Sequence, residues 1–270
     1  MNEEVVKFGK SEQLVGVLSS GQEAADAPVA IFFNAGFLHR IGPFRLWVDV
    51  ARELASKNIA SLRFDLHGLG DSPALNIGGD AVKSAISDLS EAMDLVESRL
   101  GKRSFVVFGL CSGADYAHPA AKADPRIRGL VMIDGYGYKT KSFFIHRQLR
   151  RMFSFRRWMN LAKRAVRRHE EVSLEVFKGE DARQFPASEQ IQSEILSFLD
   201  EGRRLFYIYT AGVPDYFNYQ NQFWEMFPKL KSRSGISYSY YPKTDHTFAL
   251  VRERAELTGR LVRFMTGATI

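Results

Sequence analysis

The chain has 270 residues, of which 45% are hydrophobic and 25% charged, a composition that is ordinary for a folded globular protein and excludes a disordered one. This length suits one large domain, or one core with an inserted sub-domain. No basic start followed by an apolar run opens the chain, and no stretch is apolar for long enough to cross a bilayer. The single cysteine excludes an internal disulfide and indicates little about the redox compartment, and the absence of a signal segment makes the cytoplasm the expected location.

The net charge of +6 is unevenly distributed along the chain. Residues 135–169 contain eleven Lys or Arg residues and no Asp or Glu. Such a block indicates an acidic partner, a phosphate-bearing ligand or a membrane surface, or else a solvated helical face. Nucleic acid is not expected, because no recognised nucleic-acid module accompanies the block.

Apolar patterns predict strands and helices that alternate through most of the chain. Two short strands at 5–8 and 13–18 form a hairpin, and further strands are predicted at 29–34, 59–64, 104–108, 127–133, 205–209 and 236–241. Helices are predicted at 45–57, from Asp80 as N-cap to Gly101, at 112–123 and at 247–265. This alternation predicts an α/β fold with a mostly parallel sheet between two layers of helices.

The alternation is interrupted between residues 136 and 202, which are basic, aromatic and helical in pattern. We therefore predict a core formed by residues 1–135 and 203–270, with a helical cap insertion at 136–202. Ligands of open parallel sheets bind outside the carboxyl ends of the strands, and the insertion leaves one of these ends. It lies where it could cover such a site.

Residues 108–114, FGLCSGA, form a Gly-x-nucleophile-x-Gly pattern between a predicted strand and a predicted helix. Gly109 and Gly113 allow the sharp turn, and Cys111 is presented to the cleft with a helix N-terminus behind it, which lowers the pKa of a thiol. The alternative is a buried cysteine beside an unrelated glycine turn. The strand before it and the helix after it favour a nucleophile. Ser112 lies one position off the centre of this frame.

A base and an acid are expected to follow the nucleophile in chain order. His246, just after the last predicted strand, is the histidine that fits this order. Asp215, in the segment GVPD that follows the strand at 205–209, is predicted to orient it. Asp134, at the end of the preceding strand, is the rival, whereas Asp245 is adjacent to the histidine and poorly placed to reach its ring.

The oxyanion hole is expected to combine two backbone N–H groups, those of Ser112 and Phe37. Gly36 permits the tight turn beside Phe37 and would border the substrate. In the insertion Phe143, Phe144 and Trp158 could line an acyl pocket, or pack as a structural cap. Arginines and lysines of the insertion could meet the phosphates of coenzyme A or an acidic carrier protein, and its aromatic residues could touch a membrane surface. No metal site and no cofactor is expected.

Five segments together resemble the α/β-hydrolase superfamily, in particular its serine-aminopeptidase-like and lysophospholipase-like branch. They are NAGF at 34–37, LRFDLHGLGDS at 62–72, GLCSGA at 109–114, GVPD at 212–215 and DHTF at 245–248. With HRIGP at 39–43 they also resemble hydrolases of exosortase systems and of biosynthetic clusters. The departure is Cys111 in place of the usual serine, which a few groups of the superfamily share.

A cysteine nucleophile predicts an S-acyl intermediate, formed from an ester or a thioester. Such an intermediate reacts with water, giving a hydrolase or thioesterase, or with an amine, alcohol or thiol, giving an acyltransferase. The third hypothesis is an inactive, hydrolase-like binding module, because a fold alone does not establish activity.

Overall fold

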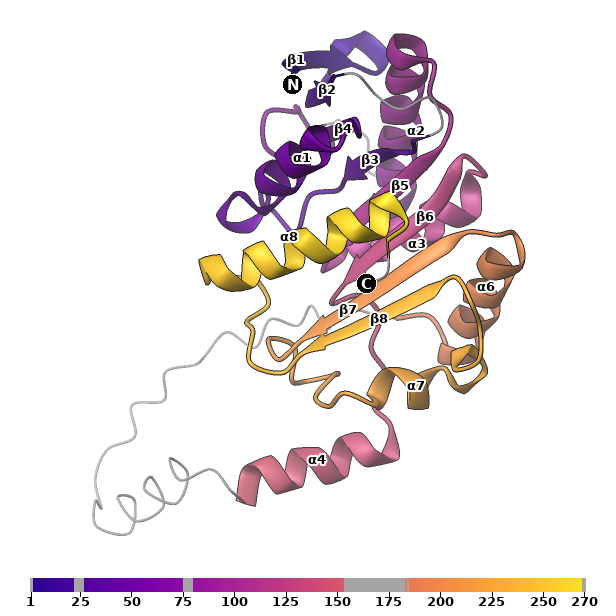
Figure 1. The fold of residues 1–270 in the computed structure, drawn as a ribbon. Coiled ribbons are helices and arrows are strands. Elements are labelled where there is room, and N and C mark those ends of the chain that lie inside the picture. The colour runs from indigo at the N-terminus through magenta and orange to yellow at the C-terminus, as the bar shows by residue number, and fades with distance from the viewer. Residues whose placement is uncertain (1, 22–26, 75–79, 153–182, 184, 269–270) are drawn as a thin grey trace.

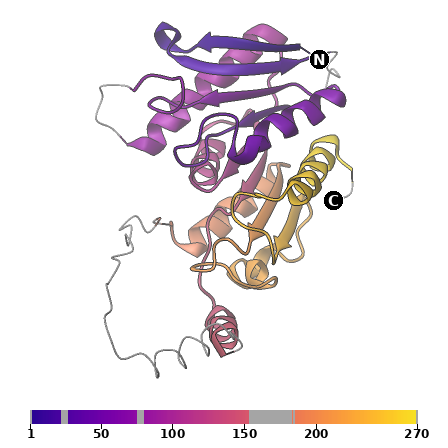
Figure 2. The same ribbon diagram turned by 90° about the vertical axis from the view of Figure 1, so that its left-hand side faces the viewer.

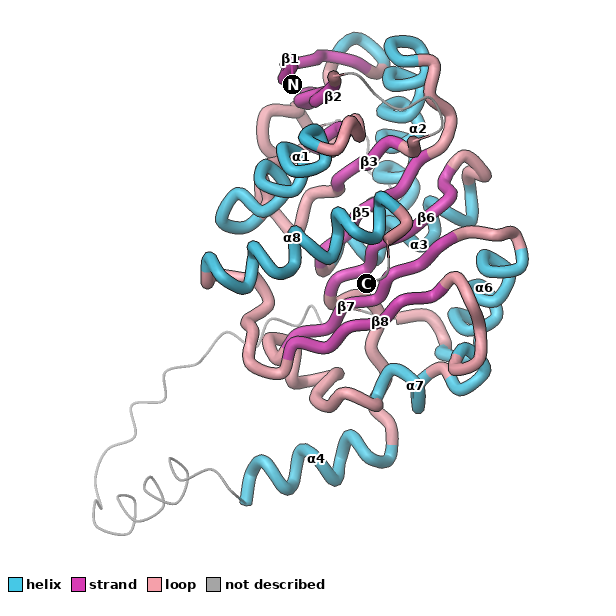
Figure 3. The backbone as a smooth tube through the Cα atoms, viewed as in Figure 1, coloured by secondary structure: helices cyan, strands magenta, loops and turns pink. Residues whose placement is uncertain are grey.

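The computed structural model describes residues 2–21, 27–74, 80–152, 183 and 185–268. Its strands form one eight-stranded sheet in the order β1-β2-β4-β3-β5-β6-β7-β8. The strands are β1 Asn2–Phe8, β2 Leu14–Ser20, β3 Val29–Phe32, β4 Ser61–Asp65, β5 Phe105–Leu110, β6 Ile127–Ile133, β7 Arg204–Thr210 and β8 Ile236–Tyr241. β1, β2 and β4 pair antiparallel, and every pair from β4 to β8 is parallel. Figure 3 shows the strands in magenta, side by side in this sheet.

Helices cover both faces of the sheet (Figure 1). On one face lie α1 (Leu46–Ser56) and α8 (Val251–Thr266), which share an apolar core with β3, β5 and β6. On the other lie α2 (Ala81–Leu100), α3 (Ser112–Ala123) and α6 (Ser188–Asp200), which share a second core with the sheet. The short helix α7 (Gln222–Met226) precedes β8. Because both faces are covered, every residue of β5 is buried, which explains its continuous apolar run.

The eight strands and the helices α1, α2, α3 and α8 lie within a few residues of their predicted bounds, whereas α7 was not predicted. The predicted cap of α2 is confirmed, since the Asp80 side chain accepts a hydrogen bond from Val82 N at 2.9 Å and Gly101 ends the helix with φ 67°. The mostly parallel sheet between two helical layers confirms the α/β-hydrolase fold class.

Between β6 and β7 the described residues contain two helices, α4 (Lys141–Met152) and α6. α6 packs into the core through Ile191, Ile195 and Phe198, whereas α4 stands away from the sheet in both views (Figure 1, Figure 2). The boundaries of the cap at 136 and 202 stay a prediction. Among the described residues, no helix is both long and apolar enough to cross a bilayer.

Candidate active site

Cys111 occupies a strained turn between β5 and α3. Its backbone has φ 57° and ψ −120°, a conformation that L-residues other than glycine rarely adopt. The two flanking glycines are sterically required. A Cβ on Gly109 would clash with the backbone of Ala114, and a Cβ on Gly113 would lie 2.6 Å from the carbonyl oxygen of Asn34. The predicted nucleophile turn is therefore present, with the cysteine at its apex.

His246 lies beside Cys111, and the carboxylate that contacts it is Asp134. Asp134 follows β6 directly and is fully buried, and its Oδ2 lies 2.8 Å from His246 Nδ1. The backbone N–H and the hydroxyl of Thr210, at the end of β7, each donate to the carboxylate at 2.7 Å. Since Nδ1 faces Asp134, the other ring nitrogen is left for the hydrogen bond that His246 shares with the Cys111 thiol.

The predicted acid, Asp215, is not brought to the histidine by this arrangement. Asp215 is exposed and lies in a turn that follows β7. The surrounding segment meets the site in other ways. Gly212 packs so closely against His246 that a Cβ there would clash with the histidine backbone. The hydroxyl of Tyr216 donates to the carbonyl oxygen of Asp134 at 3.1 Å. The turn thus positions the histidine and the acid without supplying the contacting carboxylate.

The charges of this site favour a thiolate paired with an imidazolium. Burial alone would raise the pKa of the Cys111 thiol, but the hydrogen bond with His246, the nearby Arg183 guanidinium and the Ser112 N–H outweigh it, so the pKa is lowered. Burial opposes the charged form of His246 too, yet its hydrogen bonds with Asp134 and Cys111 raise the pKa to about 9. Each charged form stabilises the other.

The loop after β3 is tied to the nucleophile turn by the hydroxyl of Ser112. Gly36 N–H donates to Ser112 Oγ at 2.9 Å, while the Ser112 N–H faces the Cys111 sulfur. Asn34 fixes the start of this loop, since its side-chain amide donates to the buried carboxylate of Asp65 at 2.9 Å. The Phe37 side chain is 94% exposed, so any contribution to an oxyanion hole would come from its backbone, and that role stays a prediction.

One functional side chain was missed by the sequence analysis, that of Arg183. Its guanidinium donates to the carbonyl oxygens of Cys111 at 3.0 Å and of Asp134 at 2.9 Å, and forms a bidentate pair with Asp115. Arg183 lies outside the basic block at 135–169, in a stretch with several acidic residues, and that isolated position is the only signal the sequence offers for it.

The aromatic residues predicted to bind an acyl chain are differently placed. Phe143 is fully buried and packs edge-on against Phe144, at a ring separation of 5.4 Å. Phe144 is half exposed on α4, and Trp158 lies outside the described residues. Their part in substrate binding stays a prediction.

In the part of the chain that the structure describes, one group of side chains has the composition of a metal site. Oxygen or nitrogen atoms of His39, Asp65 and Asp71 lie within 4.8 Å of one another. However, the guanidinium of Arg40 already lies among them, 2.5 Å from Asp65, 2.7 Å from Asp71 and 2.7 Å from His39. This cation neutralises the carboxylates, and the group serves to fix the loop that carries Gly36.

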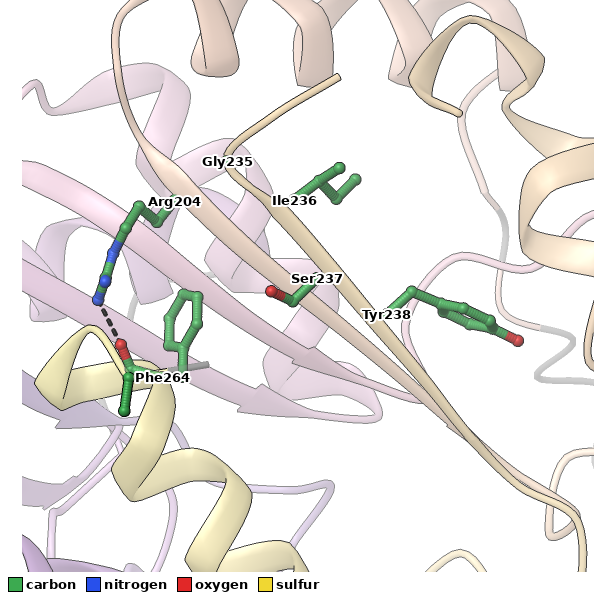
Figure 4. A pocket seen from close by; sticks show the side chains of 7 residues that line it. Arg204, Gly235, Ile236, Ser237, Tyr238 and Phe264 are labelled. Atoms are coloured by element: carbon green, nitrogen blue, oxygen red, sulfur yellow. Dashed lines mark hydrogen bonds between the residues drawn. The ribbon is translucent and has the colours of Figure 1, made fainter. Parts of the chain in front are cut away.

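A cavity of about 410 Å³ lies at the amino ends of β7 and β8, at the end of the sheet opposite to Cys111 (Figure 4). It is bordered by Arg204, Ile236, Tyr238 and Phe264, and the Arg204 guanidinium donates to the carbonyl oxygen of Phe264. Cys111 and His246 follow the carboxyl ends of their strands, so this cavity is remote from them.

Comparison with solved structures places the chain in the α/β-hydrolase fold. An α/β-hydrolase-fold protein of unknown function from Agrobacterium tumefaciens superposes with a TM-score of 0.60 at 17% identity, covering 98% of this chain and 97% of that one. An esterase from Pyrococcus furiosus gives 0.62 at 14% identity, with 98% and 91% covered. A serine hydrolase without a lid from Xanthomonas campestris gives 0.57 at 14%, with 100% and 98% covered. No protein-family model and no curated protein matches the chain.

Proposed function

We propose that this chain is an acyl-transfer enzyme, a hydrolase or thioesterase that works through an S-acyl intermediate on Cys111. The observation that carries the proposal is the continuous chain of contacts from Asp134 through His246 to the thiol, with 2.8 Å between Asp134 Oδ2 and His246 Nδ1. Cys111 stands at the apex of a strained turn before a helix, where negative charge on its sulfur is stabilised.

The proposed reaction has two halves. In the first, the Cys111 thiolate attacks the carbonyl carbon of an ester or thioester, and the N–H groups of Ser112 and Phe37 bind the developing oxyanion. The imidazolium of His246 then protonates the departing alkoxide or thiolate, which leaves the acyl group on sulfur. In the second half the neutral imidazole takes a proton from water. The resulting hydroxide equivalent attacks the S-acyl carbon, and the thiolate is released.

The test is direct acylation by a panel of short- and long-chain acyl thioesters of coenzyme A and of a carrier protein. Intact-mass and peptide mass spectrometry should find one acyl group on Cys111, and release of free thiol should show turnover. The Cys111→Ala variant should lose both signals. Turnover that survives this substitution refutes the proposal, and a thiol that reacts with iodoacetamide but with no acyl donor points to a binding module.

Transfer to an acceptor other than water is the second candidate, and the cysteine itself favours it. An S-acyl group is a thioester, which amines and thiols attack more readily than they attack an oxygen ester. Product analysis in the presence of candidate amines, alcohols and thiols separates the two reactions. A transferase gives an acylated acceptor and a turnover rate that depends on acceptor concentration, whereas a hydrolase gives free acid at a rate indifferent to it.

We also propose that helix α4 contacts an anionic phospholipid surface. One side of the helix faces the protein, because Phe143 is buried, Asn218 donates to its carbonyl oxygen at 3.2 Å, and His146 stacks on Tyr219 at 4.4 Å. Several of the exposed side chains of the helix are apolar.

The outward side of α4 exposes 52% of Phe144, 60% of Ile145 and 43% of Leu149. Lys141 and Arg147 are on the same helix, whose sequence contains no acidic residue. Exposed apolar side chains on a helix with basic and no acidic residues suit the interface of an anionic bilayer better than the surface of an acidic protein, which offers charge without an apolar interior.

Sedimentation with vesicles tests this proposal. Binding to vesicles that contain anionic phospholipid, weak binding to zwitterionic ones, and loss of binding in Phe144→Ser/Ile145→Ser are expected. Equal binding by this variant, or no binding by the parent protein, contradicts it. If an acidic carrier protein binds the parent and the vesicles do not, the surface serves a protein instead.

A further inference from the structure

One guanidinium bridges the two strained strand ends that carry the nucleophile and the acid. Cys111 and Asp134 follow the adjacent parallel strands β5 and β6, and both have positive φ values, 57° and 49°. Their carbonyl oxygens both accept hydrogen bonds from Arg183, at 3.0 and 2.9 Å. Residues in such conformations persist only where the surroundings hold them.

All five N–H donors of this guanidinium are occupied within the protein. Besides the two carbonyl oxygens, Asp115 accepts from Nε at 2.7 Å and from one terminal nitrogen at 2.5 Å, and the Tyr216 hydroxyl accepts at 2.9 Å. An arginine has five such donors in a rigid planar fork. Because none is left over, the geometry argues against a role in binding a substrate carboxylate or phosphate and in favour of a structural task.

The partner of Arg183 is itself fixed in the first turns of α3. Pro119 has no N–H to donate to the carbonyl oxygen four residues earlier, that of Asp115, and the Tyr136 hydroxyl donates to this oxygen at 3.3 Å instead. Burial raises the pKa of the Asp115 carboxyl more strongly than its bonds to Arg183 lower it. The carboxylate therefore depends on the guanidinium for its charge compensation.

We propose that Arg183 is a positioning residue that sets the nucleophile and the acid relative to each other and holds a fixed positive charge near the sulfur of Cys111. Its charge contributes to lowering the pKa of the thiol, although the hydrogen bond with His246 contributes more. The rings of Phe185 and Tyr216 lie 5.0 and 5.7 Å from the guanidinium and keep it in place. Arg183 lies five residues before the start of α6 at Ser188, so it ties the chain ahead of α6 to the turn that carries Cys111.

Charge and geometry can be separated by substitution. A lysine keeps the positive charge but, as a point donor, cannot hold both carbonyl oxygens and Asp115 at once. Arg183→Lys should therefore leave the pH profile of Cys111 alkylation near that of the parent protein while acyl turnover falls about 10-fold. Arg183→Met should lower turnover by about 10- to 100-fold and move the alkylation midpoint to higher pH, because the thiolate loses a nearby cation.

The inference rests on the proposed function only for its turnover readout, since alkylation by iodoacetamide needs no acyl chemistry. The double variant Asp115→Asn/Arg183→Met removes the uncompensated carboxylate, so a folded protein is available even where the single variant unfolds. Arg204→Met is the matched control. Arg204 also donates to a carbonyl oxygen and lies over an aromatic ring, both of Phe264, but at the opposite end of the sheet (Figure 4).

The control should leave the alkylation profile unchanged. If the folded double variant alkylates with the parent's pH profile and turns over at the parent's rate, the proposal for Arg183 is wrong. If instead no acyl donor acylates the parent protein, yet the alkylation profile of the double variant still shifts, the proposed function fails and the role of Arg183 stands.

Discussion

Replacing Asp134 by asparagine tests which carboxylate serves the histidine. The substitution keeps the shape of the side chain and leaves one oxygen to accept the hydrogen bond from Thr210 N, which Oδ1 receives at 2.7 Å. The negative charge that faces His246 Nδ1 at 2.8 Å is lost. Asp215→Asn, in the exposed turn after β7, is the matched control, because it makes the same chemical change in the acid that the sequence favoured.

The size of the effect follows from the contact that is lost. A hydrogen bond to a charged group contributes roughly 1.5–3 kcal/mol, which corresponds to a loss of rate of about 10- to 150-fold. In serine triads the same substitution costs about 10⁴-fold, since the histidine must take a proton from a neutral hydroxyl and holds the wrong tautomer. A thiol of lowered pKa depends less on a general base than a serine hydroxyl does, so we expect the smaller value for Asp134→Asn and a change below about twofold for Asp215→Asn.

Two assays give the answer independently. Acyl thioester turnover measures the whole reaction, and the pH dependence of iodoacetamide alkylation measures the thiolate alone. In Asp134→Asn the pKa of His246 should fall from about 9, because the hydrogen bond and charge of Asp134 raise it, and the alkylation midpoint should move to higher pH as the imidazolium is lost. A large loss in Asp215→Asn together with normal behaviour of Asp134→Asn refutes the assignment.

Three further outcomes are expected. Cys111→Ser should lose most turnover and regain some of it as pH rises, because a hydroxyl needs the neutral form of His246. The parent protein should instead lose activity as the imidazolium titrates away near its pKa of about 9. Identical pH profiles of the two proteins would contradict the ion pair. Ser112→Ala should reduce turnover about 10-fold, because the loop after β3 loses the hydrogen bond from Gly36 N–H to the Ser112 hydroxyl, while alkylation stays unchanged within about twofold. Parallel losses in both assays would argue instead for damage to the thiol. Gly109→Ala should destabilise the fold by about 2 kcal/mol or more in urea unfolding, since the added Cβ would clash with backbone atoms. Gly259→Ala in α8, where the atom nearest to the added Cβ is 3.7 Å away, should stabilise the fold by roughly 0.5–1 kcal/mol. Similar effects at both positions would show that the turn tolerates a side chain.

The sequence was sufficient for the fold because each element carries its own signal. Strands buried on both faces, such as β5 and β6, are continuous apolar runs, and the helices that cover them show one apolar side. The placement of Cys111 and His246 follows from the same information, since each comes just after a strand, at the carboxyl ends where ligands of parallel sheets bind. Glycines around the cysteine mark the turn because only they fit it.

The identity of the contacting acid was beyond this kind of reasoning. Asp134 and Asp215 both follow strands, and only the three-dimensional path of the chain decides which carboxylate reaches the ring. The glycine in GVPD looked like the pivot of an acid-bearing turn, yet Gly212 is small because the backbone of His246 packs against it. A weak signal for Asp134 exists at Thr210, whose N–H and hydroxyl at the end of the next strand both hold the carboxylate.

Arg183 was beyond prediction for a different reason. Its partners lie at Cys111, Asp115, Asp134 and Tyr216, far from it in the sequence, and it falls outside the basic block at 135–169. Charge pattern alone does not say which cation turns inward, because that depends on buried carbonyls and carboxylates that come together only in the folded protein.

The raised pKa of His246 and the lowered pKa of Cys111 together determine what the histidine does in each half of the proposed reaction. With a pKa of about 9, the imidazole at pH 7 is protonated in roughly a hundredfold excess, so it enters the first half as an acid, ready for the leaving group. Once the sulfur carries an acyl group, its negative charge is gone, and with it one cause of the raised pKa. The imidazole, which has already given its proton to the leaving group, then stays neutral more readily and can act as the base that activates water or another acceptor. Acylation of the cysteine itself thereby switches the histidine from acid to base, and hydrolysis and transfer differ only in which acceptor reaches the S-acyl carbon at that moment.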